Sequence, residues 1–469
     1  MPRNVFAGVG ISKKDDAYEA GKEAVENAIE DIRKRGGNKD PTFGIVFCSG
    51  GKYGKDDKTI KSFVDGAHSV FSQFKDCKWV GCTTGGEISE NNVTHGSVVV
   101  SVLSSEYIKF GVGVGKNISK NGFNAGKEAV EKAIKDIKLD KEIDAYISYM
   151  TTKTKNLSEI VKLKKFVVLT LPAGFTLKSS GWEESMMEGI KSVSGASVPI
   201  VGGSAGDDGK FVGTFQFANG QVFKDSVVLT AIFTHLKVGF GLSHGYKPTN
   251  KIALITRSKE KIIYELNNRP AAEVYAEMLG ISLNELMKGS GLLKFGEKFP
   301  RFAMDFIEKI GITKDKFLEK IDMYKFMISS PFGIPDVSGE YWAKVPKGIV
   351  EKKYIEFYNN IPEKMPITLM EIDRKKAIEA TADALKQSIS IMKRPVFSLI
   401  FECGGRYFYL GNDVKKSIEA AKKLLKGTPF IGFYTHGEQG LRMNSVSGCH
   451  TYSVTTLTIS DELVTEKNK

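Results

Sequence analysis

The sequence has no apolar stretch long enough to cross a membrane. Its longest apolar stretches, near Val98–Leu103 and Val227–Phe233, have the length of strands, whereas a membrane-spanning helix needs about 20 apolar residues. The N-terminus, Met1–Asn4, does not begin the basic and then apolar pattern of a secretion signal. We therefore expect a soluble, cytoplasmic protein with no membrane insertion.

Cysteine and histidine are both scarce. The five cysteines are odd in number and include no Cys-x-x-Cys pair, which argues against a disulfide framework and against a zinc site built from cysteine pairs. None of the six histidines lies in a His-Glu-x-x-His motif or another metal-binding spacing. No metal site is predicted, and reduced thiols are expected.

The motifs of several large enzyme classes are also missing. The chain contains no Gly-x-Ser-x-Gly elbow and no Walker A loop, and Gly111–Gly115 lacks the full dinucleotide-binding spacing. A binding protein is therefore favoured over an enzyme, with catalysis by Cys82 or Cys403 kept as an alternative.

Excess positive charge is present, since the net charge is +12. Such a charge can attract nucleic acid or anionic lipid. However, the helix-like segments interleave both signs, as in Glu23, Glu26 and Glu30 beside Lys22 and Arg33. No stacking motif or recognition helix accompanies the basic residues, so we expect solvated helix faces and no nucleic-acid partner.

An internal repeat organises the first half of the chain. Ala20–Ile32 and Ala125–Ile137 are identical at eleven of thirteen positions. In each copy the apolar residues recur at i, i+3, i+4 and i+7, which predicts a helix with one buried face. The two copies predict two similar modules, at about 8–115 and 111–245.

Each module continues with strand-like segments. Phe43–Cys48 and Ala145–Met150 follow the helices, and a glycine-rich turn comes next. Each module ends in two β-rich runs that we expect to form a hairpin: Val98–Leu103 with Ile108–Val114, and Val227–Phe233 with Leu236–Leu242. We predict an α/β fold with mixed sheets flanked by helices, a domain at 1–250, a second α/β domain at 251–462 and a tail at 463–469.

Glycine-rich turns carry the functional prediction. Gly81–Glu87 and Gly432–Glu438 both read Gly-x-x-Thr-x-Gly-Glu, and Gly202–Asp208 has the same length with altered residues. Glycine lets the backbone approach a ligand closely, and successive amides in such turns can hold an anion. A hydroxyl and a carboxylate add partners for a zwitterion such as an amino acid. The alternative is that these are tight turns whose glycines serve backbone geometry alone.

The candidate ligand-binding residues come from these turns and from Cys403–Arg406, which we expect between two strands, Val396–Glu402 and Tyr407–Leu410. Arg406 can grip a carboxylate or pair with a protein acid. Cys403 is more typical of a small core residue than of a nucleophile. The full set is Gly81, Cys82, Thr83, Thr84, Glu87, Gly203, Ser204, Asp207, Cys403, Arg406, Thr435, His436, Gly437 and Glu438.

These motifs resemble those of a known family. Val80–Glu87 and Val201–Asp207 resemble the FIST N domain, and Asn268–Ala271, Cys403–Arg406 and Gly432–Glu438 resemble the FIST C domain. The resemblance runs from about Gly8 to Ser460 in the family's order.

The resemblance implies an intracellular sensory protein for small ligands such as amino acids. This sequence shows no kinase, cyclase or chemoreceptor segment, so a separate signalling protein is the expected partner. It also has an additional helical stretch around Leu283–Tyr324. No cofactor is predicted from the residues; the resemblance implies haem binding and nitric-oxide sensing as an alternative.

Overall fold

The computed structural model describes residues 3–90, 92–137, 166–176, 179–288, 328–336, 339–443 and 445–464, and it has the expected mixed α/β architecture. The chain forms two compact units. The predicted boundary at residue 250 does not follow these units, because the last part of the chain returns to the first unit. Unit 1 comprises Met1–Ser243, Ile378–Cys449 and Ser453–Lys469; unit 2 comprises His244–Ala377 and His450–Tyr452. Among the described residues, no helix has both the length and the apolar character needed to cross a membrane.

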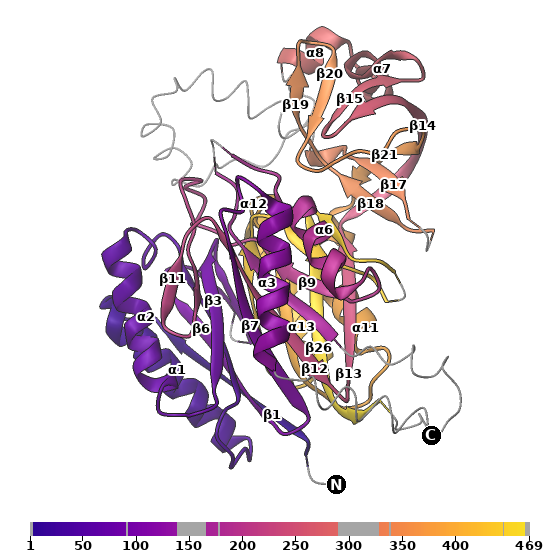
Figure 1. Cartoon of the computed structure of the whole chain (residues 1–469). Helices are drawn as coiled ribbons and strands as arrows, with labels where there is room; N and C mark the ends of the chain where they lie inside the picture. Colours follow the sequence, from indigo (N-terminus) through magenta and orange to yellow (C-terminus); the bar gives the residue numbers. More distant parts are fainter. Residues whose placement is uncertain are drawn as a thin grey trace, which may run out of the picture. The chain divides into compact units, whose positions relative to one another are not determined.

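Unit 1 contains three six-stranded sheets that share one strand order (Figure 1). The first consists, in order, of β1 (Val5–Ser12), β6 (Val98–Ser105), β2 (Phe43–Ser49), β3 (Lys78–Thr84), β10 (Gln216–Ala218) and β11 (Gln221–Phe223). The second consists of β7 (Ile108–Lys116), β12 (Ser226–Thr234), β8 (Phe166–Pro172), β9 (Ile200–Gly203), β24 (Glu438–Gly440) and β25 (Gly448–His450). The third consists of β13 (Leu236–His244), β26 (Ser453–Leu463), β22 (Pro395–Cys403), β23 (Phe430–Thr435), β4 (Glu87–Ser89) and β5 (Asn92–Thr94).

Each sheet takes its first four strands from one segment of the chain and its last two from another. The parallel pair β2 and β3 has counterparts in β8 and β9 and in β22 and β23. The hairpin β10–β11 joins β3, β4–β5 joins β23, and β24–β25 joins β9. The three sheets are therefore joined cyclically by exchanged hairpins.

The predicted terminal hairpins of the two modules are wrong, although all four strands exist. β6 pairs with β1 and β2, whereas β7 pairs with β12. Likewise β12 pairs with β7 and β8, and β13 neighbours β26. The short turns between these strands carry the chain from one sheet to the next, which a pattern of alternating residues cannot reveal. The predicted strand Ala145–Met150 lies outside the described residues.

Helices cover the outer faces of the sheets, and both copies of the repeated motif are helical as predicted. They are α1 (Ala17–Lys34) and α2 (Asp57–Phe71) on the first sheet, α3 (Gly122–Ile137) and α6 (Glu183–Ser194) on the second, and α11 (Arg374–Ile389) and α13 (Val414–Leu425) with the third. The short helices α12 (Gly404–Leu410) and η1 (Gly411–Asp413) precede α13.

Glycines on the first strand of each sheet allow these helices to pack closely. A Cβ atom at Gly113 would lie 1.9 Å from the carbonyl oxygen of Ala129, and Gly10 and Gly241 meet carbonyl oxygens of α1 and α11 at 2.1 and 1.8 Å. Since no side chain tolerates such distances, Gly111–Gly115 serves helix packing and not nucleotide binding.

Two aspartates of the repeated helix motif cap free edges of the sheets. The backbone N–H of Val9 on β1 donates to Asp31 of α1 at 2.9 Å. The N–H of Val112 on β7 donates to Asp136 of α3 at 2.8 Å. An unpaired amide on an edge strand invites wrong pairing or costs desolvation, so the same position of each helix covers one exposed donor.

We expect Asp31→Ala and Asp136→Ala each to lower the free energy of unfolding by about 1–2 kcal/mol, because each leaves a strand amide without its charged acceptor. Urea unfolding of the full chain measures this. Glu30→Ala is the matched control, since Glu30 lies on α1, is 63% exposed in its side chain and pairs with Lys34 on the surface of the same helix. Equal effects of Asp31→Ala and Glu30→Ala would contradict the capping role.

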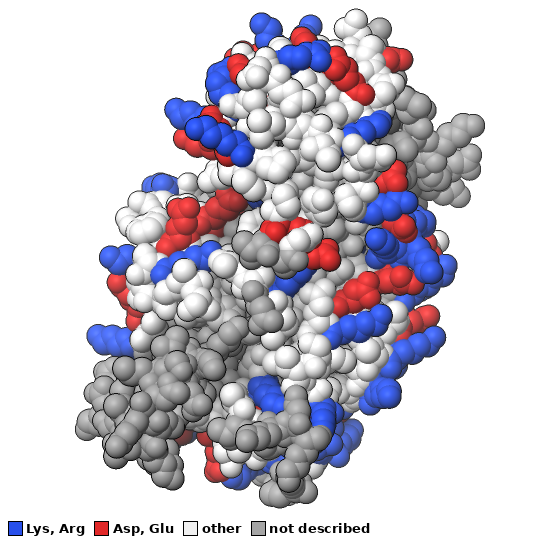
Figure 2. All heavy atoms as spheres, turned by 90° about the vertical axis from the view of Figure 1, so that its right-hand side faces the viewer, with Lys and Arg blue, Asp and Glu red and all other residues white. Residues whose placement is uncertain are grey.

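The inner faces of the three sheets pack into one apolar core. Phe47 of the first sheet and Phe433 of the third have ring centroids 4.7 Å apart, and Phe43 stacks on Phe110 of the second sheet at 4.1 Å. This shared core fixes the sheets against one another, and the strand ends with them. On the molecular face in Figure 2, Lys and Arg lie interspersed with Asp and Glu, as the interleaved helices predict.

Unit 2 is an antiparallel sheet with short helices. Its strands, in order, are β18 (Tyr341–Lys344), β17 (Phe332–Pro335), β21 (Pro366–Ile372), β14 (Tyr246–Lys259), β15 (Ile262–Leu266), β20 (Tyr354–Phe357) and β19 (Pro346–Val350), with β16 (Arg269–Pro270) paired to β15. The helices α7 (Ala271–Leu279) and α8 (Leu283–Lys288) follow β16. The rest of the predicted helical stretch to Tyr324, and the predicted tail from 465 onward, lie outside the described residues.

Candidate functional site

Three strand-end turns, one from each sheet of unit 1, meet in a single group of residues. We call residues 83–87, 203–208 and 434–438 the turn cluster. The amide of Gly85 donates to the carbonyl oxygen of Tyr434 at 3.0 Å, that of His436 to Ser204 at 3.0 Å, and that of Gly206 to Thr83 at 2.9 Å. Each turn thus donates to another, in a closed cycle. The structure brings the three predicted turns together.

Within the turn cluster, Glu87 and Glu438 brace their own turns. Glu87 accepts hydrogen bonds from the hydroxyl of Thr84 at 2.5 Å and from the hydroxyl and amide of Ser97. Glu438 accepts from Thr435 at 2.5 Å and from the hydroxyl and amide of Ser453. Both carboxyl groups are fully buried. Their partners are therefore protein groups of the same turns and adjoining strands.

Burial dominates the titration of both acids. It raises the pKa of Glu87 to about 8, with the nearby Asp208 carboxylate adding to the rise. It raises the pKa of Glu438 to about 7, against the lowering effect of the Thr435 and Ser453 hydrogen bonds. Near pH 7 the Glu87 carboxyl group is therefore mostly protonated and the Glu438 carboxyl group partly so, which suits a brace better than a partner for a ligand ammonium group.

The corresponding position of the third exchanged hairpin is held by Gln216, an amide and not an acid. Glu87 pairs with Phe433 and Glu438 with Gly203, each as the first residue of an exchanged hairpin. Gln216 pairs in the same way with Cys82. The turn after β9 is longer than the other two, so the residue that corresponds to Glu87 lies beyond Asp208, at Gln216.

The additional residues of that turn, 207–215, form a loop organised by Asp207. Its buried carboxylate accepts from the amides of Phe211, Val212 and Gly213 at 2.9, 2.8 and 3.2 Å. Phe211 has φ +53°, a conformation unusual for an aromatic residue. Val212 is 72% exposed. The loop therefore presents Phe211 on its inner side and meets solvent on its outer side.

The neighbouring Asp208 ties the same loop to the first sheet. Its carboxylate accepts from the hydroxyl of Ser49 and the amide of Gly51, both at 2.6 Å, and lies 3.7 Å from Nδ1 of His95. Burial acts to raise the pKa of Asp208, but hydrogen bonds from His95, Ser49 and Gly51 lower it by more, so the pKa lies below its ordinary value. Asp208 is therefore a charged anchor.

His436 lies at the meeting point of the turn cluster and the loop. Nε2 is 3.7 Å from Oδ1 of Asp207, and its ring lies 5.0 Å from that of Phe211 and 4.8 Å from that of Phe175. Burial lowers its pKa despite the opposing Asp207 charge, so the imidazole is neutral near pH 7. Nδ1 is buried and has no hydrogen-bond partner among the described residues. An imidazole in this state can donate or accept one further hydrogen bond.

Arg406 does not lie between two strands, because Tyr407–Leu410 belongs to helix α12 and the predicted strand there is wrong. The chain turns into a helix directly after Cys403. The Arg406 guanidinium pairs with Glu402 at 3.1 Å, and the two side chains are 4% and 0% exposed. Of the two interpretations, the protein ion pair is the one that the geometry supports.

The remaining predicted residues serve packing. Cys82 is fully buried, and burial raises its thiol pKa well above the usual value, which disfavours a thiolate. Cys403 is buried and forms a hydrogen bond with Glu438. At Gly81 a Cβ atom would meet the carbonyl oxygen of Val46 at 2.1 Å, and at Gly203 it would meet Thr435 at 2.4 Å.

The chemistry available at the turn cluster is that of recognition. Asp207 supplies a carboxylate, His436 a neutral donor or acceptor, and Phe175 and Phe211 supply apolar ring faces. Sequence reasoning missed both phenylalanines and His95, since no spacing or motif marks them. Among the described residues, no group of three or more His, Cys, Asp or Glu side chains is arranged to hold a metal ion.

Comparison with known proteins gives two family matches. Residues 42–269 match the FIST N domain and residues 303–441 match the FIST C domain, together more than half of the chain. A relative from Methanocaldococcus jannaschii, named "Uncharacterized protein MJ1623", is 28% identical over 364 residues, which are 77% of this chain. The chain spans 60% of the length of that relative.

Solved structures give only remote likenesses. A cyanuric acid hydrolase from A. caulinodans aligns over 97% of this chain and 99% of its own, at 8% identity and a TM-score of 0.34. PurLQS from Thermotoga maritima aligns over 97% of this chain and 73% of its own, at 10% identity and a TM-score of 0.20. At these TM-scores neither likeness bears on the function of this chain.

Proposed function

This chain belongs to the FIST family, whose domains are associated with sensory signal transduction, and we propose on that premise that it is a cytoplasmic sensor that binds a small ligand at the turn cluster. The ligand class is an amino acid or a related small molecule with an apolar side chain. A separate signalling protein receives the output. The catalytic alternative gains no support from the thiols of Cys82 and Cys403, since both are buried.

One observation carries the proposal: the cyclic hydrogen bonds that place turns from all three sheets at one point. A ligand held there contacts groups that follow strands of both the second and the third sheet. Asp207 offers an acceptor for an ammonium group, His436 offers Nδ1, and Phe175 and Phe211 offer ring faces for an apolar side chain. Because these groups come from the 434–438 turn, the 207–215 loop and the segment after β8, a bound ligand changes the relative stability of their arrangements.

The 207–215 loop is the element that we expect to move. Phe211 occupies the ring face of His436, so a ligand ring or branched side chain must displace it. Trp182 lies close enough to report this change, since its indole Nε1 donates to the carbonyl oxygen of Ala173 at 2.9 Å, two residues before Phe175. Ligand binding should therefore alter Trp182 fluorescence.

A panel of the standard amino acids tests the proposal by thermal unfolding of the full chain. A ligand at one hundred times its Kd should stabilise the native state by about 2.7 kcal/mol. His436→Ala should abolish the shift caused by any stabilising ligand. His235→Ala is the control, because His235 is exposed at the turn between β12 and β13. A ligand that stabilises the wild type and His436→Ala equally does not bind at the turn cluster.

The haem alternative finds no suitable histidine here. An axial ligand needs a ring nitrogen that faces open space for a macrocycle. His436 is enclosed by Asp207 and two phenylalanine rings, and His95 packs against Tyr407 at 4.9 Å and against Asp208. The two histidines around the turn cluster thus do not fit haem.

A further inference from the structure

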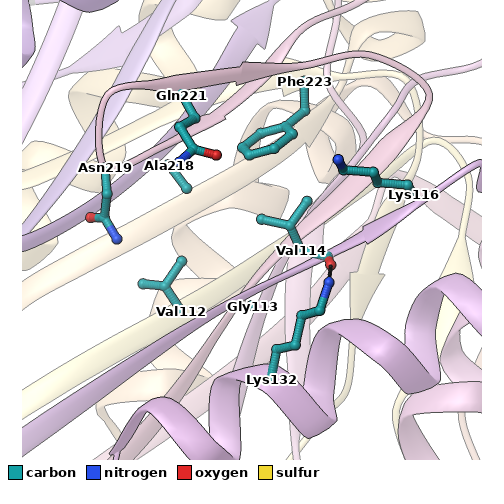
Figure 3. A pocket seen from close by; sticks show the side chains of 9 residues that line it. All are labelled: Val112, Gly113, Val114, Lys116, Lys132, Ala218, Asn219, Gln221 and Phe223. Carbon is teal, nitrogen blue, oxygen red and sulfur yellow. Dashed lines mark hydrogen bonds between the residues drawn. The ribbon is translucent and has the colours of Figure 1, made fainter.

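A second feature of unit 1 lies away from the turn cluster. A groove of about 300 Å³ runs between the edge strand β7 and the hairpin β10–β11. In Figure 3, Val112 and Val114 of β7 form one wall, and Phe223 and Gln221 project from the hairpin on the other. Lys116 lies at one end, and Lys132 reaches up from α3 to Val114. The groove is apolar along its length and basic at one end.

Hairpin β10–β11 has no acidic residue that could pair with the two lysines of this groove. Lys132 donates to the carbonyl oxygen of Val114 at 3.1 Å and pairs with Glu128 of its own helix. The ammonium group of Lys116 lies 5.9 Å from the centre of the Phe223 ring and, within the described part of the chain, has no carboxylate within 4.0 Å. An anion entering this end of the groove would meet the ammonium group of Lys116, the Phe223 ring and Lys132, whose charge is shared with Glu128.

The corresponding groove beside the first sheet differs in this respect. It lies between β1, α1 and the exchanged hairpin β4–β5, with a volume of about 290 Å³. There Arg35 of the helix pairs with Glu90 of the hairpin at 3.0 Å and with Asp31 at 2.7 Å. The hairpin of the Figure 3 groove has Asn219 and Gln221 and no acid. In the groove beside the first sheet Arg35 pairs with two acids, whereas in the groove of Figure 3 Lys132 pairs with Glu128 and the ammonium group of Lys116 has no carboxylate within 4.0 Å among the described residues.

We propose that the groove of Figure 3 is a second ligand site, which binds a small carboxylic acid with an apolar body. The carboxylate lies between Lys116 and Lys132, and the apolar body lies on Val112, Val114 and Phe223. The volume lies at the small end of the range for ligand pockets, about 300–1,000 Å³. The site is independent of the turn cluster and of the sensory function proposed for it.

Phenylacetate is a suitable probe, titrated into the full chain by calorimetry and by ligand-observed NMR. We expect saturable binding that weakens at least about fivefold in Lys116→Gln, because a charge-assisted contact is lost. Phe223→Ala should weaken it similarly, and Gln221→Glu should abolish it by placing an acid in the groove. Lys13→Gln is the matched control, because Lys13 directly follows β1, as Lys116 ends β7, and does not line the groove of Figure 3.

The outcomes separate the alternatives. Phenylacetamide, which lacks the charge, should bind more weakly than phenylacetate. Inorganic phosphate binding as tightly as phenylacetate, with no effect of Phe223→Ala, would overturn the site in favour of a simple cationic patch. Equal effects of Lys13→Gln and Lys116→Gln would also overturn it. His436→Ala should leave phenylacetate binding unchanged, so failure of the turn cluster proposal and failure of this one can be told apart.

Discussion

Arg406→Met should lower the free energy of unfolding by about 3–5 kcal/mol, because it leaves the carboxylate of Glu402 buried without its cation. Glu402 is fully buried and also accepts a hydrogen bond from the hydroxyl of Thr381 at 3.2 Å. Methionine fills much of the same volume, so the loss reports the charge and not a cavity. Chemical unfolding followed by tryptophan fluorescence measures it.

The double variant Glu402→Gln, Arg406→Met is the control for this experiment. It removes both charges, and we expect it to recover at least half of the lost stability. The opposite pattern would be a small loss of stability in Arg406→Met together with loss of ligand-induced stabilisation. That result would restore the ligand-binding interpretation of Arg406.

Replacing Glu87 and Glu438 together by glutamine should make unfolding nearly independent of pH where the wild type is most sensitive to it. The folded pKa values, about 8 for Glu87 and about 7 for Glu438, lie above the ordinary value of 4.5. Their favourable contribution is therefore complete below pH 4.5 and is lost as pH rises through the folded values. For Glu87 the full change corresponds to about 5 kcal/mol.

Glutamine is a conservative test because Gln216 already holds the corresponding place on the third hairpin. Urea unfolding at about pH 5 and about pH 8.5 should show the wild type losing several kcal/mol, and the double variant losing much less. Glu30→Gln, on the exposed face of α1, should behave as wild type. A double variant with the wild-type pH dependence would mean that other groups titrate in this range.

The repeated helix and most strands could be predicted because their signals are local. The apolar spacing of Ala20–Ile32 and Ala125–Ile137 specifies a helix with one buried face, and alternate glycines in Gly111–Gly115 mark close packing on it. Strand pairing could not be read in the same way. β6 and β7 are adjacent in sequence but lie in different sheets, since hairpin exchange is decided by tertiary packing.

The third sheet could not be recognised in the sequence, because the segment that forms unit 2 separates β13 from α11 along the chain. One local signal was nevertheless available. Gly50–Tyr53 after β2 and Gly404–Tyr407 after β22 both read Gly-Gly, then a basic residue, then Tyr. That the turns lie together could be expected, because each of them follows a strand. The roles of their side chains could not be predicted from the sequence. One donor to the Glu87 carboxyl group is Ser97, which lies ten residues away in the sequence, so the turn itself does not identify it.

The loop and its aromatic contacts were beyond sequence reasoning for a different reason. Phe211 and Phe175 come from separate connections, and their meeting with His436 depends on the nest of amides around Asp207. No periodicity describes such a loop. The groove of Figure 3 could not be predicted from the sequence either. The charge of Lys116 stands out only when this groove is compared with the ion-paired groove beside the first sheet.

Hydrogen exchange of the full chain, with and without the amino acid that stabilises it most, tests the central account most directly. If the turns act as one site, peptides covering 83–87, 203–208 and 434–438 should gain protection together at saturating ligand. Protection confined to one of the three peptides, or located in unit 2 alone, would contradict a shared site where the sheets of unit 1 meet.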